Sequence, residues 1–330
     1  MRIDRIIKLV SIAILVLLGF SCKKIETHKD VDYNSIPAVI ADNYNLSIFS
    51  KSLEMTKTDL LLQDATVPYT VIVPSNDAFN LIDITTPIEL IQKSYSWVER
   101  MAKYHIIPGK INFKQFPFLI NQVVPTADGK KLYVSKWLRG RDSVLTINGA
   151  DVLLEDVPSS TGLIQIVNRV MTSYEHEKIS ETLKSVEQIS LFSEMVRRSD
   201  LLTDLSGNTE YTIFAPTNEA VVQAGYTSLE KILETDKSEL RNFCMYHISL
   251  GRRFLNDYIF SIGESNKGFQ RMINNQNINV RLIPDPQNQS RFTGIEVAQL
   301  INPKYYKIVE RDLLAGNGII HIIDGVLASK

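Results

Sequence analysis

Three histidines are the residues of this chain with the clearest capacity for chemistry. His105, His247 and His321 could bind a metal ion or transfer a proton, because imidazole is a common metal ligand that titrates near neutral pH. A metal site needs several converging ligands, often at short spacing such as His-x-x-x-His, and the sequence contains no such pair. We therefore predict core histidines that bond to backbone groups, with no metal ion or other cofactor.

The sequence also offers no nucleophile in a setting that would activate it. Cys244 lies on the apolar side of a helical pattern at residues 240–246, which predicts a small buried thiol. The motifs Gly-x-Ser-x-Gly and Gly-x-Gly-x-x-Gly and the phosphate-binding loop are all absent from the sequence. We predict no catalytic residue and no enzymatic activity.

Two asparagine–acid pairs could accept a ligand, but their surroundings favour a structural role. Each pair follows five β-prone residues that end at a proline, which stops a strand. A hydroxyl residue then stands where it can cap a helix, and the acidic residue favours the positive helix end. The residues concerned are Pro74, Ser75, Asn76 and Asp77, and again Pro216, Thr217, Asn218 and Glu219.

These landmarks recur because the chain contains an internal repeat. Residues 69–79 resemble residues 211–221, an offset of 142 that also relates Tyr104-His105 to Tyr246-His247. A third pair, residues 162–170 and 318–326, lies at an offset of 156. Solenoid repeats have periods of roughly 20 to 50 residues, whereas this repeat has the size of an independent domain. We predict two tandem domains.

The elements that position these residues follow the same order in both copies. Each copy is expected to open with helices, continue through the strand and capped helix, and form a second helix before its Tyr-His pair. A polar turn at 284–290 is expected to interrupt the strands of copy two, and residues 171–178 lack glycine and proline, which favours a fairly fixed domain pair. The later strands are predicted at 131–137, 143–147 and 163–167, and at 278–283, 294–298 and 319–323.

The first residues have the layout of an export signal. Basic residues precede an apolar run of 12 residues at 9–20, too short for a spanning helix, which needs about 20 residues. Residues 18–22 resemble a bacterial lipobox, which implies that Cys22 is acylated and inserts into membrane lipid; a short membrane anchor is the alternative. We predict a signal peptide at 1–21 and a polar tether at 22–35. Lys23 and Lys24 favour the outer membrane by analogy and leave the leaflet open.

The charge of the chain excludes one class of partner. The formal net charge is −1, and residues 1–21 carry +2, so the remainder carries −3 (−1 − 2 = −3). A nucleic-acid-binding domain presents a concentrated basic field to phosphates, and this chain has none. We predict no nucleic-acid partner.

Taken together, the motifs resemble those of the fasciclin (FAS1) family over residues 36–173 and 179–329. The resemblance implies two α+β domains, each a β-wedge of two sheets with helices packed alongside. Copy one departs from the pattern, since residues 161–170 lack the His and the Asp-Gly of the closing motif. The residues matched to the motifs of copy two are Thr212–Ala220, Tyr246, His247, Asn317, Gly318, His321, Asp324 and Gly325.

The resemblance implies a non-catalytic function in adhesion or in binding an envelope or extracellular protein or glycan. With the lipobox, it predicts a lipid-anchored cell-envelope protein at the outer membrane. The alternatives are a glycan-binding accessory lipoprotein of a polysaccharide uptake system and an envelope scaffold without an exposed ligand. Trp137, Arg139 and Arg141 are candidate binding residues, because aromatic and Arg side chains dominate interaction hot spots. Packing of Trp137 at a strand end and a hairpin tip at 138–142 are the structural alternatives.

Overall fold

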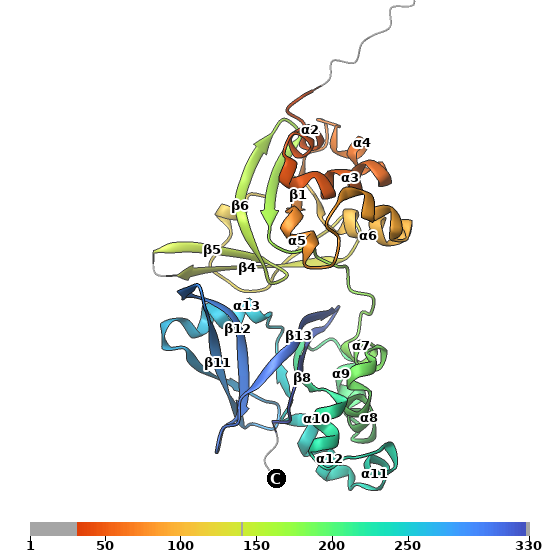
Figure 1. Ribbon diagram of the computed structural model, residues 1–330, viewed down its shortest axis with the longest axis vertical. Coiled ribbons are helices and arrows are strands. Elements are labelled where there is room, and N and C mark those ends of the chain that lie inside the picture. Colours follow the sequence, from red (N-terminus) through yellow and green to blue (C-terminus); the bar gives the residue numbers. More distant parts are fainter. Residues whose placement is uncertain (1–31, 140, 328–330) are drawn as a thin grey trace, which may run out of the picture. The chain divides into compact units, whose positions relative to one another are not determined.

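Figure 1 shows the computed structural model of the chain, which describes residues 32–139 and 141–327. Residues from Asn34 onward form one compact unit that contains both repeats. The predicted signal peptide and Cys22 lie outside the described residues, as does most of the predicted tether. Within the described ranges, no helix is both long enough and apolar enough to cross a bilayer.

The helices of the first domain gather on one side of its strands (Figure 1). Apolar residues at helical spacing, among them Phe49, Leu53 and Met101, are fully or almost fully buried against the sheet. These elements are α2 (Ile36–Ala41), η1 (Tyr44–Leu46), α3 (Ser47–Thr56), α4 (Thr58–Leu62), α5 (Asn76–Asn80), η2 (Pro87–Gln92) and α6 (Tyr95–Tyr104). The short helix η3 (Phe113–Gln115) instead packs Phe113 into the core inside the wedge.

The seven strands of the first domain run in the order β2-β1-β7-β6-β5-β4-β3. Only β1 and β7 are parallel. The long strand β6 has two register shifts, around Leu154, which bend it and divide the sheet into two halves. This geometry confirms the predicted wedge. The strands are β1 (Tyr69–Pro74), β2 (Ile106–Pro108), β3 (Gln122–Pro125), β4 (Lys131–Arg139), β5 (Asp142–Ile147), β6 (Ala150–Ser159) and β7 (Gly162–Val167).

The second domain repeats this plan with the strand order β10-β11-β12-β13-β14-β8-β9 and the parallel pair β8 and β14. Its helices are α7 (Ile179–Ser185), η4 (Glu187–Ile189), α8 (Ser190–Arg198), α9 (Leu201–Leu205), α10 (Asn218–Gln223), α11 (Leu229–Glu234), α12 (Lys237–Met245), α13 (Leu255–Ile262) and η5 (Gly263–Ser265). Its strands are β8 (Tyr211–Pro216), β9 (Ile248–Leu250), β10 (Lys267–Arg271), β11 (Asn277–Asp285), β12 (Asn288–Gln299), β13 (Tyr306–Ala315) and β14 (Gly318–Ile323).

The additional residues of the second domain enlarge its wedge. Helix α13 stands where the first domain has only η3, and β12 has 12 residues where β5 has 6. The sequence predicts a polar turn at 284–290, and the turn in the structure is shorter. Asp285 pairs with Asn288 across Pro286 and Gln287, so β11 and β12 form one long hairpin.

Each domain has two apolar cores, one on either side of the parallel strand pair. In the first domain, Val71 and Val73 of β1 face the helices, whereas Ile72 faces the interior of the wedge. In the second domain, Ile213 and Phe214 of β8 divide in the same way. The parallel strands are therefore buried on both faces, which explains their continuous apolar sequences.

The hydroxyl residue after each proline caps the following helix. Ser75 Oγ accepts a hydrogen bond from the backbone N–H of Ala78, and Thr217 Oγ1 accepts one from Ala220, both at 3.2 Å. The next residue has a different role. Asn218 Oδ1 accepts a hydrogen bond from the N–H of Leu191 at 2.9 Å, and its Nδ2 donates to the carbonyl of Glu187 at 2.9 Å. The side chain thus joins α10 to the start of α8.

Asn76 makes the same connection in the first domain. Its Oδ1 accepts a hydrogen bond from the N–H of Ile48 at 3.1 Å, and its Nδ2 donates to the carbonyl of Tyr44 at 2.9 Å. The sequence pattern predicts a capping role for this asparagine as well as for Ser75. The structure instead uses the amide to hold a helix that precedes it by about 30 residues in sequence.

We expect Thr217→Ala to lower the free energy of unfolding of the second domain by about 1 kcal/mol, because the first turn of α10 loses its cap. Thr217→Ser is the matched control, since Ser75 caps the equivalent helix at the same distance. Urea denaturation followed by circular dichroism would measure both variants. Equal midpoints for Thr217→Ala and the unaltered chain would contradict the capping role.

Candidate functional site

The histidines of the two Tyr-His pairs have the same buried environment. In His105, Nδ1 donates a hydrogen bond to the carbonyl of Met101 at 2.7 Å, and Nε2 accepts one from the N–H of Met171 at 3.1 Å. In His247, Nδ1 donates to Phe243 at 2.9 Å, and Nε2 accepts from Leu327 at 3.0 Å. Burial lowers the pKa of each imidazole to about 4. Both ring nitrogens are occupied by backbone groups, so neither ring is available to a metal ion.

His321 is also fully buried and bonded to the backbone. Its Nε2 donates to the carbonyl of Arg253 at 2.9 Å, and its Nδ1 accepts from the N–H of Asp312 at 3.3 Å. Burial lowers the pKa of this imidazole as well. Among the residues that the structure describes, no group of three or more His, Cys, Asp and Glu side chains could hold a metal ion.

The other residues with chemical capacity also serve the fold. Cys244 is buried, and burial raises the pKa of its thiol. Tyr104 and Tyr246, which precede the two histidines, donate their hydroxyls to the carbonyls of Lys131 and Asn277 at 2.8 and 3.0 Å. These bonds connect each helix to the far half of its sheet.

The candidate binding residues of the first domain lie around the hairpin of β4 and β5. Arg139 pairs with Asp142 across its tip, and Trp137 stands opposite Val144. Trp137 is half-buried, whereas Arg139 and Arg141 are exposed. None of these three residues lines the groove around Tyr226 and Tyr306 or the cavity around Arg169.

One cavity of the second domain is an open groove with a volume of about 1200 Å³. It brings together Tyr246, Asp324 and Gly325, which belong to two motifs far apart in the sequence. The remaining walls come from α11, α12, the start of β13 and the adjoining loops. The charged and aromatic side chains of these walls are Tyr226, Lys231, Glu234, Asp236, Glu239, Phe243, Lys304 and Tyr306.

The groove is acidic and aromatic. Glu234, Asp236, Glu239 and Asp324 oppose Lys231 and Lys304, which leaves a formal charge of −2. The hydroxyl of Tyr226 donates to Glu239 Oε1 at 3.0 Å, and its ring packs edge-on against Phe243 with centroids 5.3 Å apart. Burial and this carboxylate raise the pKa of Tyr226 to about 12.

Tyr306 forms the wall beside the closing motif. A Cβ atom on Gly325 would lie 1.8 Å from the Tyr306 ring, so only glycine fits at this position. Lys304 Nζ lies 5.4 Å from the centroid of the same ring. Carboxylates and aromatic rings can hold a ligand by hydrogen bonds and stacking. The groove is equipped for binding.

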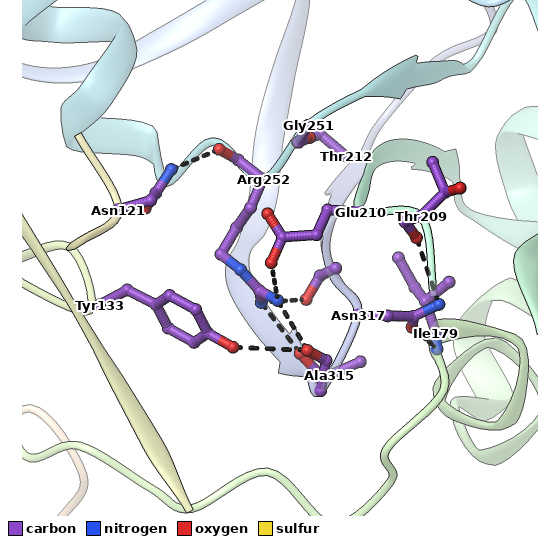
Figure 2. Close-up of polar contacts among 12 residues, drawn as sticks. Asn121, Tyr133, Ile179, Thr209, Glu210, Thr212, Gly251, Arg252, Ala315 and Asn317 are labelled. Atoms are coloured by element: carbon purple, nitrogen blue, oxygen red, sulfur yellow. Dashed lines mark hydrogen bonds and ion pairs between the residues drawn. The ribbon is translucent and has the colours of Figure 1, made fainter. Parts of the chain in front are cut away.

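A second set of polar contacts joins the two domains around Arg252, whose side chain is fully buried (Figure 2). Its guanidinium donates to the carbonyls of Ala315 and Gly318 at 2.9 Å, to Gly316 at 2.8 Å, and to the Glu210 carboxylate at 3.1 Å. The guanidinium therefore closes the turn between β13 and β14. Sequence patterns could not identify this residue, because its carbonyl acceptors lie more than 60 residues further along the chain.

The first domain packs against this guanidinium from the other side. The Tyr133 ring lies over it, with 3.9 Å from Arg252 Cζ to the ring centroid. Asn121 Nδ2 donates to the Arg252 carbonyl at 2.5 Å (Figure 2), and Asn256 Nδ2 donates to Asp151 Oδ1 at 2.8 Å. Stacking and hydrogen bonds thus hold the two domains against one another.

Asn317 and Gly318 begin the closing motif and serve the same turn. Asn317 Oδ1 accepts the N–H of Ile179 at 2.6 Å, which fixes the start of α7 (Figure 2). A Cβ atom on Gly318 would lie 2.6 Å from the carbonyl oxygen of Tyr211, so the close approach of β14 and β8 requires glycine. In the first domain, Thr161 Oγ1 accepts the N–H of Ile36 at 3.0 Å in the position of Asn317.

The buried histidines should make stability depend on pH. Their folded pKa of about 4 lies below the ordinary 6.5, so the unfolded chain binds more protons between these values. The neutral histidines contribute fully to the free energy of unfolding above about pH 6.5. This contribution is lost as the pH falls toward 4, by up to about 1.4 kcal/mol per pH unit for each histidine. Asp257, whose pKa burial raises to about 6, opposes part of this loss.

We therefore expect the free energy of unfolding, measured with urea, to fall from pH 7 to about pH 5. His247→Gln should make this slope shallower for the second domain. His176→Gln is the control, because the His176 side chain is partly exposed. A flat profile over this range would contradict the neutral, backbone-bonded state of the histidines.

Comparison with known proteins agrees with this geometry. A family model described as the fasciclin domain matches residues 44–173 and 187–329. Periostin from Homo sapiens is 24% identical over 273 residues, which cover 78% of this chain and 28% of periostin. Transforming growth factor-beta-induced protein ig-h3 from Sus scrofa is 22% identical over 265 residues, which cover 78% of this chain and 34% of that protein. The chain thus spans about a third or less of these two relatives.

A solved structure is also similar to this chain. It is a FAS1 domain pair from the insect cell adhesion molecule Fasciclin I, with a TM-score of 0.42 and 20% sequence identity over 88% of this chain and 98% of the solved chain. The two family matches together cover most of the sequence and fall on the two domains described above. This chain belongs to the fasciclin domain family.

Proposed function

We propose that this protein is a non-catalytic, lipid-anchored protein of the cell envelope that mediates adhesion or binds a macromolecule. The observation that carries the proposal is the contrast between the two kinds of polar site. The described histidines of the motifs and Cys244 are buried and engaged within the fold, whereas the groove of the second domain is open and lined by charged and aromatic side chains. Such a lining suits recognition.

The contacts between the domains support a binding function. An interface holds its partner with less loss of entropy when the surface that presents it is already ordered. Arg252 and Tyr133, which are buried, and Asn121, which is partly exposed, join the two domains by stacking and a hydrogen bond. The pair can therefore present the groove as one ordered surface.

The anchor rests on the sequence alone. The apolar run at 9–20 ends next to Cys22, and a polar stretch of about a dozen residues separates this cysteine from α2. A cysteine that carries several acyl chains would hold the protein durably at a membrane, because each buried methylene adds about 0.8 kcal/mol. The outer membrane is the proposed location.

Cys22→Ser should abolish the anchor. We expect the variant to lose palmitate labelling and to leave the membrane fraction or to accumulate as an uncleaved precursor. Cys244→Ser is the matched control, since this second cysteine is buried in the second domain. Unchanged labelling of Cys22→Ser would show that another residue carries the lipid.

Charge reversal in the groove should weaken binding. We expect residues 23–330 to bind saturably to an envelope protein or glycan ligand, and Glu239→Lys to reduce the affinity about tenfold or more, because one charged hydrogen bond contributes about 1.5–3 kcal/mol. Asp42→Lys makes an equal charge change at an exposed position of the first domain and should leave binding unchanged.

Arrays of glycans and pull-downs of envelope proteins would identify the class of ligand. Saturable binding to a defined oligosaccharide without a protein partner would favour the alternative function, an accessory lipoprotein of polysaccharide uptake. Equal binding by Glu239→Lys and the unaltered chain would place the interaction outside the groove.

A further inference from the structure

The groove of the second domain has a counterpart in the first. The β6–β7 and β13–β14 pairs have the same register, since Val152 pairs with Val167 and Ile308 with Ile323. A cavity of about 600 Å³ in the first domain is lined by the equivalent positions. The equivalent residues, written as first domain/second domain, are Ile82/Ala224, Trp97/Glu239, Arg100/Asn242, Met101/Phe243, Asn148/Lys304, Ala150/Tyr306, Arg169/Gly325 and Val170/Val326.

The two cavities differ in what covers them. The cavity of the first domain is also lined by residues of the second domain, including Thr182 of α7 and the 310–314 segment of β13. It therefore lies between the domains, whereas the groove is lined by the second domain alone. A ligand in the smaller cavity would contact both domains.

At two neighbouring positions, the large and the small residue have changed places between the domains. As a result, a cation lies in the cavity of the first domain. In the second domain, the Tyr306 ring occupies the space beside Gly325. In the first domain, Ala150 stands at the position of Tyr306, and Arg169 at the position of Gly325. The missing ring leaves room for the arginine side chain. This exchange is the structural consequence of the lost Asp-Gly of the closing motif in copy one.

Arg169 has no direct partner among the described residues, although it is only partly exposed. The nearby carboxylates, Asp151 and Asp312, are already engaged. Asp151 accepts hydrogen bonds from Asn168 and Asn256, both at 2.8 Å. Asp312 accepts from the Leu255 N–H at 2.8 Å and from Arg311 Nε at 2.7 Å. Burial and the charge of Arg311 lower the pKa of Arg169, so this cation is poorly compensated.

Thr182 supplies a second unsatisfied group in the same cavity. Its side chain is 8% exposed, and its Oγ1 has no hydrogen-bond partner among the described residues. Buried hydroxyls are nearly always hydrogen-bonded in folded proteins. An unpaired guanidinium and an unpaired hydroxyl from opposite domains thus line one space, and each can donate to an acceptor bound there.

We propose that the cavity between the domains binds an organic carboxylate. Its carboxylate group accepts hydrogen bonds from the Arg169 guanidinium and the Thr182 hydroxyl, because the planar guanidinium matches the two oxygens of a carboxylate. Trp97, Val170 and Met171 offer aromatic and apolar contacts for the rest of the ligand. The volume lies within the range of roughly 300–1,000 Å³ typical of small-molecule sites.

The charges of the lining favour a monoanion over a phosphate dianion. Glu175, Glu310 and Asp312 are also part of the lining, and they balance Arg100, Arg169 and Arg311 in number. Arg311 is paired with Asp312, and Arg100 is exposed to solvent, so Arg169 is the partly buried cation of the lining that needs an added acceptor. A second negative charge would be repelled. The proposal is independent of the lipid anchor and of the open groove.

Isothermal titration calorimetry of residues 23–330 with D-glucuronate tests the site. D-glucose is the matched neutral probe, because it has the same ring without the carboxylate. We expect saturable binding of glucuronate at one site per chain, and weaker binding of glucose and of inorganic phosphate. Absence of saturable glucuronate binding, or equal affinity for glucose or phosphate, would overturn the carboxylate site.

Variants of Arg169 locate the site. Arg169→Gln should weaken glucuronate binding about tenfold or more, and Arg169→Lys should have an intermediate effect, because lysine keeps the charge and loses the bidentate geometry. Arg291→Gln removes an exposed arginine of the second domain that lines neither cavity, so it should leave the affinity unchanged. A melting temperature within the range of the unaltered chain would show that the variants are folded. Unchanged affinity of folded Arg169→Gln would overturn the assignment.

Discussion

The parallel pairing of one early strand with the last strand is the constraint on which each domain depends. β1 pairs with β7, and β8 pairs with β14, although the paired residues lie more than 90 positions apart in the sequence. Both strands are buried on two faces, so the helices and the wedge assemble on either side of the pair. The close approach of Gly318 to Tyr211, the bond from Asn317 to α7 and the bond from Leu327 to His247 all occur at the ends of this pair. The most recognisable motifs of the sequence are therefore the residues that hold these ends.

Much of the fold follows from sequence patterns, and the missing parts have physical causes. The repeat predicts two domains, and the apolar runs predict the buried strands, which are present as β1, β4, β5, β7, β8, β11, β12 and β14. The patterns did not reveal β6 or β13, because register shifts interrupt their alternation and leave many of their side chains partly exposed. The edge strands β2 and β9 have only three residues each, too few for any periodicity to emerge.

The sites were less predictable than the fold, because they depend on distant contacts. Asn218 was expected to belong to a helix cap, but its partners lie at the start of α8, about 30 residues earlier. The burial of Arg252 depends on carbonyls of the turn between β13 and β14, and on a tyrosine ring from the other domain. Arg169 shows that a difference between the repeats can mark a site. It replaces the glycine of the closing motif, and it lines the cavity between the domains. Its lack of a partner could be seen only once the bonds of Asp151 and Asp312 were known.

The bonds at the ends of β14 also define how the second domain would carry mechanical load. The chain enters the domain at Ile179, which is bonded to Asn317 just before β14, and the last described residue, Leu327, is bonded to His247 just after it. Tension between these points runs along the axis of β14. The hydrogen bonds of β14 to β8 and β13 lie across this axis, so they resist together in shear and do not open one after another. In the first domain, Thr161 and His105 hold the ends of β7 in the same way, which gives both domains a load path through their most buried strand.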